Sequence, residues 1–399
     1  MTRTIHLDPV SRVSASFLSM TVTLGGEEPP QLHPSSSTWP SRIRDLARGR
    51  VPADIPDIVS RVCGTCSPMH QIAACGALEA ALGIEVPPQI HSMRRLLAWG
   101  DLIRSHAHHV FLLHAPDFLG FRDAWEMGRH FGPVVGWGLR LRGLGTRMVT
   151  LIGGRAVHPV TLRCGGFHRL PGRGALEALL PDLEAARQDC LEALDWLGEL
   201  AFPELDRPCP CDAVDGAGYP LGAIGTSSPH RGEPGDEATL GGPLARFNLH
   251  HDRLGPLPRE AAARAGLRVP CNNPFLSPVV RVVEILQAVE QAMAVIGDAQ
   301  WPREPWVPLP PGRECSGSAR VETARGPLRH TYRLDRTGRI EAATIHPPSQ
   351  HLLDVIQADV AAFRARLAEM PPYRAAWVAG QMVRNHDPCH TCVGQEGNG

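Results

Sequence analysis

The stretch that decides the fold reads Arg61-Val-Cys-Gly-Thr-Cys-Ser-Pro-Met-His-Gln71. It places two cysteines, Cys63 and Cys66, directly before a segment with clear helix punctuation. Ser67 suits the N-cap, Pro68 the first helical position, and Gly83 the residue after the helix. A Cys-x-x-Cys loop allows both sulfurs to turn toward one centre. The stretch therefore predicts a pair of thiol ligands at the start of a helix.

A second cysteine pair, Cys389 and Cys392, lies near the other end in Asp387-Pro-Cys-His-Thr-Cys392. Two such loops form a four-thiolate site, which favours zinc, iron–sulfur or other soft metals. A zinc ribbon would place its pairs within a few tens of residues, whereas Cys66 and Cys389 are 389 − 66 = 323 positions apart. A thioredoxin-like dithiol needs one pair beside a βαβ unit, which this sequence lacks. The spacing favours two distant loops that hold one centre in a large core.

Composition excludes several classes of protein. The chain has 399 residues, with 40 Lys+Arg against 41 Asp+Glu and a formal net charge of −1. This balance gives no general attraction to nucleic acid or to anionic membranes. No apolar run reaches the roughly 18–20 residues of a membrane helix. The first residues lack a secretory signal, so we expect a cytoplasmic, reducing location, where paired cysteines bind metals more often than they form disulfides.

The pattern along the chain predicts a single α+β domain over residues 1–399, predominantly α. Residues 203–243 contain 15 Gly or Pro in 41 positions, which indicates a long excursion on the surface. A hairpin is expected around Asp335–Gly338. A strand is predicted at 17–24, and helices are predicted at 67–83, 92–114, 175–200, 278–296, 350–368 and 374–384.

Both cysteine motifs resemble those of the nickel-iron hydrogenase large subunit. Smaller motifs of that family follow in the same order, so the resemblance covers nearly the whole chain. It implies a hydrogenase large-subunit-like helical core with small peripheral β elements. The smaller motifs are Asp8–Arg12, Ser105–His108, Gly153–Pro159, Asn273–Phe275 and Glu322–Gly326.

The resemblance also implies a ligand set. In the family, four thiolates hold nickel, and one thiolate of each pair bridges to an iron that carries cyanide and carbon monoxide. By position, Cys63 and Cys389 would be terminal nickel ligands, and Cys66 and Cys392 would bridge to the iron. The expected cofactor is therefore an Fe(CN)2CO unit, with nickel as a possible addition.

Three further residues are implied to surround this cofactor. His70 matches a histidine near a bridging sulfur, where a donor would tune the thiolate. Arg325 matches the arginine that faces the diatomic ligands, and Ser349 matches a hydroxyl that bonds a cyanide. Cyanide nitrogens are anionic acceptors, for which guanidinium and hydroxyl groups are good donors. Without the motifs, Arg325 would be interpreted as a solvated turn arginine and Ser349 as a helix N-cap.

Three positions depart from the family pattern. Ser14 stands where the family has a glutamate that passes protons, and a serine hydroxyl does not ionise near neutral pH. Arg44 aligns with a magnesium-binding glutamate, although the neighbouring Asp45 offers a carboxylate. Gln395 replaces the histidine that ligates magnesium and marks the cleavage site of the maturation protease.

These departures favour a hydrogenase assembly protein of the HoxV/HupK type, which does not turn over hydrogen. Such a maturation scaffold would hold or transfer the Fe(CN)2CO unit, with maturation proteins and the catalytic large subunit as partners. The alternative is an enzyme, a divergent catalytic large subunit of a nickel-iron hydrogenase. A zinc-stapled structural protein is the third hypothesis.

Other histidines and cysteines are given simpler interpretations. His106 and His109 lie three positions apart on one predicted helix, where a separate metal site is possible. Histidines on such a helix are more often hydrogen-bonded within the protein, which is the interpretation we favour. Cys209 and Cys211 are expected to be exposed loop thiols.

Overall fold

The computed structural model describes most of the chain. The described residues are 3–7, 10, 18–24, 29–34, 39–215, 218–225, 239–298, 302, 304–348 and 352–388.

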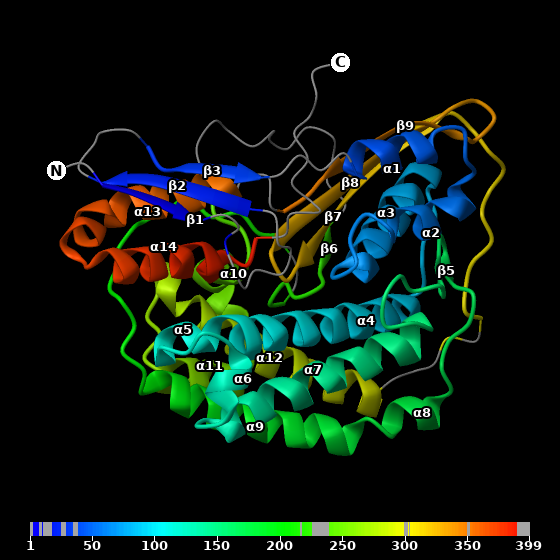
Figure 1. The fold of residues 1–399 in the computed structure, drawn as a ribbon. Coiled ribbons are helices and arrows are strands. Elements are labelled where there is room, and N and C mark those ends of the chain that lie inside the picture. Colours follow the sequence, from blue (N-terminus) through cyan, green and yellow to red (C-terminus); the bar gives the residue numbers. More distant parts are fainter. Residues whose placement is uncertain are drawn as a thin grey trace.

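Four long helices form the body of the molecule and lie across the lower part of Figure 1. They are α4 (Pro88–Ala107), α7 (Gly132–Gly153), α9 (Leu180–Gly198) and α12 (Ser277–Asp298). Helix α4 packs against α7 and α12, and α9 packs against α7 and α12. The crossing of α4 and α7 needs glycine, because a Cβ on Gly145 would lie 2.5 Å from the carbonyl oxygen of Gly100.

A four-stranded antiparallel sheet lies beside the cysteine helix α3 (Ser67–Leu82). Its strands are β6 (Ile224–Gly225), β7 (Cys315–Thr323), β8 (Gly326–Leu334) and β9 (Ile340–His346), in that order. Strands β7 and β8 pack directly on α3. Helix α3 is buried along nearly its whole length, because the sheet covers it on one side and other helices cover the rest.

A second sheet, β1 (Arg3–Leu7), β2 (Leu18–Leu24) and β3 (Gln31–Pro34), is antiparallel in that order. It packs on α13 (Leu352–Glu369) and α14 (Pro372–His386), as the upper left of Figure 1 shows. Alternate residues of β2 are buried, and they form a smaller hydrophobic cluster with apolar residues of α13 and α14. Helix α14 leads directly into the segment that carries the second cysteine pair.

Shorter elements connect these layers. Helix α4 continues into a π-helical segment, His108–His114. The short helices are α1 (Trp39–Ala47), α2 (Ile55–Val59), α5 (Ala115–Leu119), α6 (Ala124–Gly128), α8 (Arg173–Glu177), α10 (Pro243–His250) and α11 (Pro256–Arg264). The pair β4 (Leu162–Arg163) and β5 (Gly166–Phe167) and the 3-10 turns Pro52–Asp54, His251–Arg253 and Pro274–Leu276 complete the described elements.

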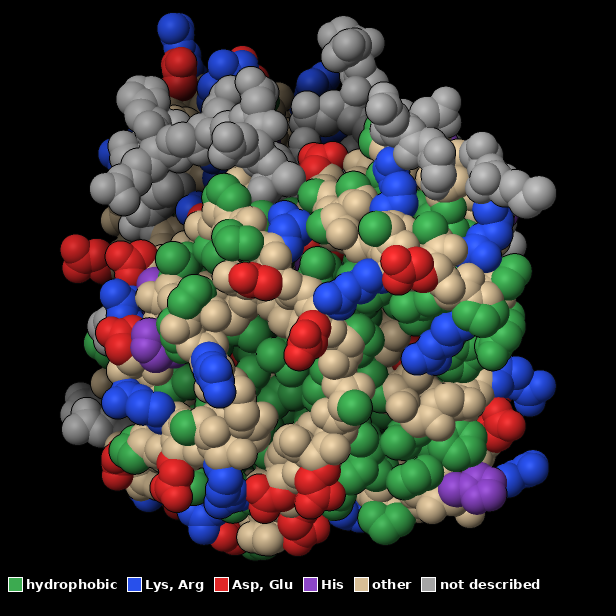
Figure 2. All heavy atoms as spheres, turned by 90° about the vertical axis from the view of Figure 1, so that its left-hand side faces the viewer, with side chains coloured by type: hydrophobic (Ala, Val, Ile, Leu, Met, Phe, Trp, Pro, Cys, Tyr) green, Lys and Arg blue, Asp and Glu red, His purple; other side chains and the backbone are tan. Residues whose placement is uncertain are grey.

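The predicted class, a predominantly helical α+β protein with small sheets, is confirmed. The expected exposure of Cys209 and Cys211 is wrong, because both are half-buried against the main core. Within the described residues, no helix combines the length and apolarity needed to cross a membrane. Figure 2 shows acidic and basic side chains interspersed over one face of the molecule, which agrees with the balanced net charge.

Candidate metal centre

The first cysteine loop is buried at the N-terminus of α3. Cys63 is 2% exposed and Cys66 is 7% exposed. Cys66 takes the N-cap position of α3, so the predicted N-cap Ser67 is wrong; Ser67 is the first residue of the helix. The Cys63 sulfur lies 3.1 Å from the hydroxyl oxygen of Thr65. The partial positive charge of a helix N-terminus stabilises anionic sulfur, so the loop suits two thiolate ligands.

Helix α4 fixes this loop from the other side. The guanidinium of Arg104 donates to the Asp101 carboxylate at 2.6 Å and to the Thr65 carbonyl at 3.3 Å. Burial raises the pKa of Asp101; the Arg104 charge opposes this, and the nearby Cys63 adds to the rise. This coupling places the carboxylate close to the first cysteine of the pair.

A chain of three buried side chains runs from α3 into the sheet. The Nδ1 atom of His70 lies 3.0 Å from Nε2 of His330, and Nδ1 of His330 lies 2.8 Å from the Tyr332 hydroxyl. All three side chains are fully buried. Burial lowers the pKa of His70 to about 4, against the opposing charge of Cys63. His70 is therefore a neutral ring whose tautomer is fixed by its hydrogen-bonded neighbours.

Arg325 binds the start of the C-terminal segment. It lies between β7 and β8 and is 4% exposed. Its Nε donates to the carbonyl of Asp387 at 2.9 Å, and a second nitrogen lies 2.7 Å from the carboxylate of the same residue. A third nitrogen lies 3.4 Å from the Ser105 hydroxyl on α4. This contact holds Asp387, which stands two residues before Cys389 in the sequence, near Ser105 of α4.

The structure places Cys63, Cys66 and His70 at the start of α3, and Arg325 lies near Asp101, which also lies near Cys63. Cys389, Cys392 and Ser349 lie outside the described residues, as do Ser14 and Gln395. Among the residues that the structure describes, no group of three His, Cys, Asp or Glu side chains is placed to hold a metal ion.

The donors that the structure does describe fit a thiolate-bound metal with anionic ligands. Two buried sulfurs at a helix N-terminus are accompanied by a nearly fully buried guanidinium. Arg44 is half-buried on α1 and Asp45 is exposed, so the carboxylate at this position faces solvent.

Sequence reasoning missed a buried charge network on α12. Glu284 accepts two hydrogen bonds from Arg246, both at 2.7 Å, and lies 2.8 Å from Nε2 of His106. Arg281 lies 3.0 Å from the other nitrogen of His106. Burial would raise the pKa of Glu284, but the Arg246 charge lowers it to about 2. A signal existed in the sequence, since two charges three positions apart interrupt the apolar run 278–289.

The sequence left two interpretations for His106 and His109, a separate metal site or hydrogen bonds within the protein, and their contacts favour the second. His106 is bonded to Glu284 and Arg281, and Nε2 of His109 donates to the Arg384 carbonyl at 2.6 Å. His106 is bonded through both ring nitrogens and His109 through Nε2, so both rings link helices, which agrees with the interpretation favoured from the sequence.

Known proteins that are similar to this chain are hydrogenases. The family model described as nickel-dependent hydrogenase matches residues 43–129. The subunit alpha of sulfhydrogenase 1 from Pyrococcus furiosus is 24% identical over 97% of both chains. The subunit alpha of sulfhydrogenase 2 from the same organism is 36% identical over 44% of this chain and 42% of its own. These matches support the nickel-iron hydrogenase large-subunit family.

Solved structures show the same fold. An NAD+-reducing [NiFe]-hydrogenase in the H2-reduced state has a TM-score of 0.80 at 22% identity, over 98% of this chain and 99% of its own. A [NiFeSe]-hydrogenase from Dm. baculatum has a TM-score of 0.74 at 17% identity, over the same shares. The matched family model is described as nickel-dependent, and the first of these structures is a [NiFe]-hydrogenase. The relatives named here are hydrogenase subunits, so the predicted assembly-protein type does not follow from them.

Proposed function

We propose that this chain is a divergent metal-binding large subunit of a nickel-iron hydrogenase. The observation that carries the proposal is the contact of Arg325 with Asp387. It joins the start of the C-terminal cysteine segment to a buried position beside the first cysteine loop. Sulfhydrogenase 1 subunit alpha, which matches over 97% of both chains, favours the enzyme over the assembly protein.

Four thiolates would hold the centre: Cys63, Cys66, Cys389 and Cys392. A nickel-iron centre with an Fe(CN)2CO unit supplies the chemistry of heterolytic hydrogen cleavage. The guanidinium of Arg325 and the hydroxyl of Ser349 would donate to the anionic ligands, because charge-assisted donors bind such acceptors strongly. A partner subunit that carries electrons would complete the enzyme, as the alpha-subunit names of the relatives suggest.

The His70–His330–Tyr332 chain would keep a neutral imidazole beside the first cysteine pair. A neutral ring with one nitrogen engaged by His330 presents its second nitrogen to its other neighbours in a fixed protonation state. Asp101 and Arg104 would hold the loop at its other side. These groups position and polarise the thiolates.

A maturation scaffold is the second candidate, favoured by a specific observation. Ser14, Arg44 and Gln395 replace groups that pass protons, bind magnesium and mark the protease site in the family. A protein that carries the Fe(CN)2CO unit to a catalytic large subunit needs none of these three functions. Its partners would be maturation proteins and the immature large subunit.

One preparation separates the candidates. Protein purified anaerobically from its own host is analysed for nickel, iron and zinc, for CN and CO infrared bands, and for hydrogen-dependent dye reduction. The enzyme predicts both metals, the bands and turnover of about 1–10³ per second. The scaffold predicts iron and the bands without nickel or turnover. Zinc without the bands contradicts both candidates.

Cysteine variants test the ligand assignment in the same assays. Cys66→Ala should abolish the bands, because no other described thiol can take its position at the N-cap of α3. Cys75→Ala is a matched control on the same helix: Cys75 is fully buried, and burial raises its pKa to about 12, so it remains a packed thiol. Equal loss of the bands in both variants would indicate a folding defect rather than a lost ligand.

A further inference from the structure

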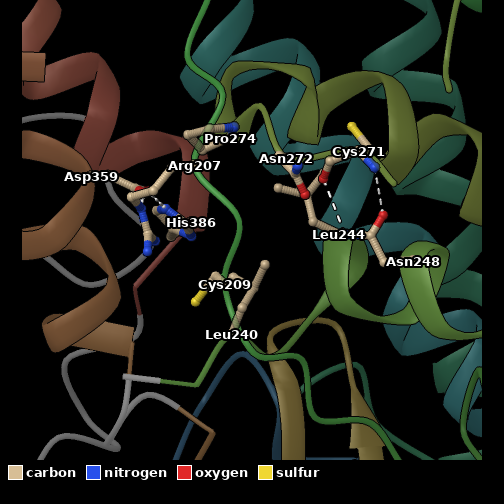
Figure 3. Close-up of a pocket in the computed structure, with 10 residues that line it drawn as sticks. All are labelled: Arg207, Cys209, Leu240, Leu244, Asn248, Cys271, Asn272, Pro274, Asp359 and His386. Carbon is tan, nitrogen blue, oxygen red and sulfur yellow. Dashed lines mark hydrogen bonds and ion pairs between the residues drawn. The ribbon is translucent and has the colours of Figure 1, made fainter. Parts of the chain in front are cut away.

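Three cavities lie in a row between the surface and Arg325. The outermost is an open groove of about 310 Å³ with Glu204, Asp206, Arg268, Cys271 and Asn272 in its wall. The next is a small, partly open cavity, shown in Figure 3, which shares Cys271 and Asn272 with the groove.

The innermost cavity shares part of its wall with the middle one. Leu240, Leu244 and His386 line both, and the inner cavity also touches Arg281 and Arg325. The row of cavities therefore ends at Arg325, which binds Asp387.

The two inner cavities have the size and polarity for water. Each has a volume of about 10 Å³, which is roughly the space of one water molecule. A buried water needs about two to four polar partners. The middle cavity offers such groups from Arg207, Asn248, Asn272 and Asp359. The inner cavity offers them from Ser277, Arg281, Arg325 and Asn385.

His386, which lines both of these cavities, belongs to a triad with Asp359 and Arg207, which line the middle cavity. Nε2 of His386 lies 2.6 Å from one carboxylate oxygen of Asp359, and the Nε of Arg207 donates to the other oxygen. Figure 3 shows the three side chains directed toward one another from the 203–215 segment, α13 and the end of α14. Asp359 is 1% exposed and His386 is 6% exposed.

The triad fixes how His386 can carry a proton. A carboxylate held by a guanidinium accepts from the ring, so the neutral ring carries its proton on Nε2. The lone pair is then on Nδ1. An aspartate that holds a histidine in this way also stabilises the imidazolium form.

We propose that this row of cavities is a water-filled proton path between solvent and the Arg325 side of the metal centre, with His386 as its relay. Nδ1 of His386 takes a proton from a water of the inner cavity and becomes imidazolium. It then releases that proton to the water of the middle cavity and returns to the neutral ring. This inference rests on the proposed function, because the path serves a centre that exchanges protons with hydrogen.

The first test uses the metal-free protein, so it does not depend on the proposed function. With 15N-labelled histidine, NMR measures how fast the His386 ring proton exchanges with water, and His386→Gln assigns the signal. Leu244→Phe fills the shared wall of the two inner cavities and should slow the exchange by about tenfold. Leu249→Phe is the control, since Leu249 lies on the same helix α10 but is 46% exposed.

Two results of this test would overturn the path. One is a His386 ring proton that stays protected for hours in the unmodified protein, and the other is equal exchange in the two phenylalanine variants. If Leu244→Phe fails to fold, Asp359→Ala replaces it: loss of the acceptor should shift the ring toward the other tautomer, visible in the 15N shifts. An unchanged tautomer in Asp359→Ala would also overturn the relay.

The second test uses the metal-loaded protein and follows isotope exchange between D2 and water. His386→Gln and Asp359→Asn should lower the exchange rate by about 10²-fold, with nickel, iron and infrared bands unchanged. Asp354→Asn, an exposed carboxylate on the same helix α13, should leave it unchanged. Full exchange in His386→Gln with intact bands overturns the relay. Absence of the centre in unmodified protein refutes the proposed function, whereas the metal-free test still decides the path.

Discussion

At the scale of single residues, buried charge is matched almost entirely by arginine. Arg94 forms a two-point contact with Glu79, at 2.7 and 2.6 Å, and both side chains are buried. The planar guanidinium suits this role because it presents several donors in a fixed geometry and stays charged. Arg325 uses the same property on Asp387, with the carbonyl and the carboxylate of one residue as its acceptors.

Loss of the Arg325 charge should be costly. Arg325→Gln would leave the Asp387 carboxylate, which is fully buried, without its ion-pair partner. Breaking a buried pair on one side typically costs about 3–5 kcal/mol. We expect this loss in the free energy of unfolding by urea denaturation, together with loss of bound metal.

Arg333→Gln is the control for this variant. Arg333 lies on β8 of the same sheet, and its ion pair with Glu341 is exposed, with side-chain exposures of 59% and 49%. Exposed pairs contribute about 0–1 kcal/mol. If the two variants lost equal stability, the Arg325 contact would be no more than a surface pair.

At the scale of elements, strand β7 approaches α3 so closely that no side chain fits at Gly317. A Cβ on Gly317 of β7 would lie 2.4 Å from both the Ala77 carbonyl oxygen and the Ala81 nitrogen of α3. Both are backbone atoms, which cannot move without shifting the helix. The position of the cysteine loop relative to Arg325 thus depends on this contact, because α3 begins at the loop and β7 ends beside Arg325.

Gly317→Ala should therefore push β7 away from α3. Overpacking of a core typically costs about 1–3 kcal/mol, and we expect that loss in the free energy of unfolding. The displaced loop should also reduce metal content. Gly143→Ala in α7 is the control, since nothing lies within 4 Å of its added Cβ. Alanine there should stabilise the helix by about 0.5–1 kcal/mol, and a loss in that variant would contradict the packing argument.

The π-helical segment links α4 to the C-terminal helix. Nε2 of His114 lies 2.9 Å from the side-chain oxygen of Asn385, and its Nδ1 lies 2.9 Å from Asp117. Arg384 of α14 bonds the same aspartate at 2.6 and 3.0 Å. Helix α14 is therefore held over its last turn, immediately before the second cysteine segment begins.

At the scale of the whole molecule, buried neutral histidines should make the fold sensitive to acid. Burial lowers the pKa of His106 to about 4 and that of His109 and His330 well below the usual range. Between about pH 6.5 and pH 4 the unfolded chain binds protons that the folded chain does not, so the free energy of unfolding falls as the pH falls. Above about pH 6.5 this contribution is constant.

The contribution of one of these rings, His106, to the pH dependence of the free energy of unfolding can be measured separately. Urea denaturation at several pH values should show a shallower decline in His106→Gln, by up to about 1.4 kcal/mol per pH unit. His130→Gln removes an exposed histidine and should leave the slope unchanged. A slope equal to that of the unmodified protein in His106→Gln would mean that this ring is charged in the folded state.

The sequence by itself determined the helical class, the cysteine loop and the start of α3, because these depend on local order along the chain. Pro68, Gly83 and the apolar run of α12 each act on their immediate neighbours. The resemblance in the motifs also placed His70 and Arg325 beside the loop. Cys389, Cys392 and Ser349 stay predictions, since they lie outside the described residues.

Only the tertiary structure decided which distant groups meet. His70 and His330 are 260 positions apart, and Arg325 and Asp387 are 62 apart. The triad of Arg207, Asp359 and His386 joins three segments with no shared local pattern. Periodicity predicts which face of an element is buried, but not which charge it will face. That pairing depends on the packing of whole helices and sheets, and it determines where a buried charge can be compensated.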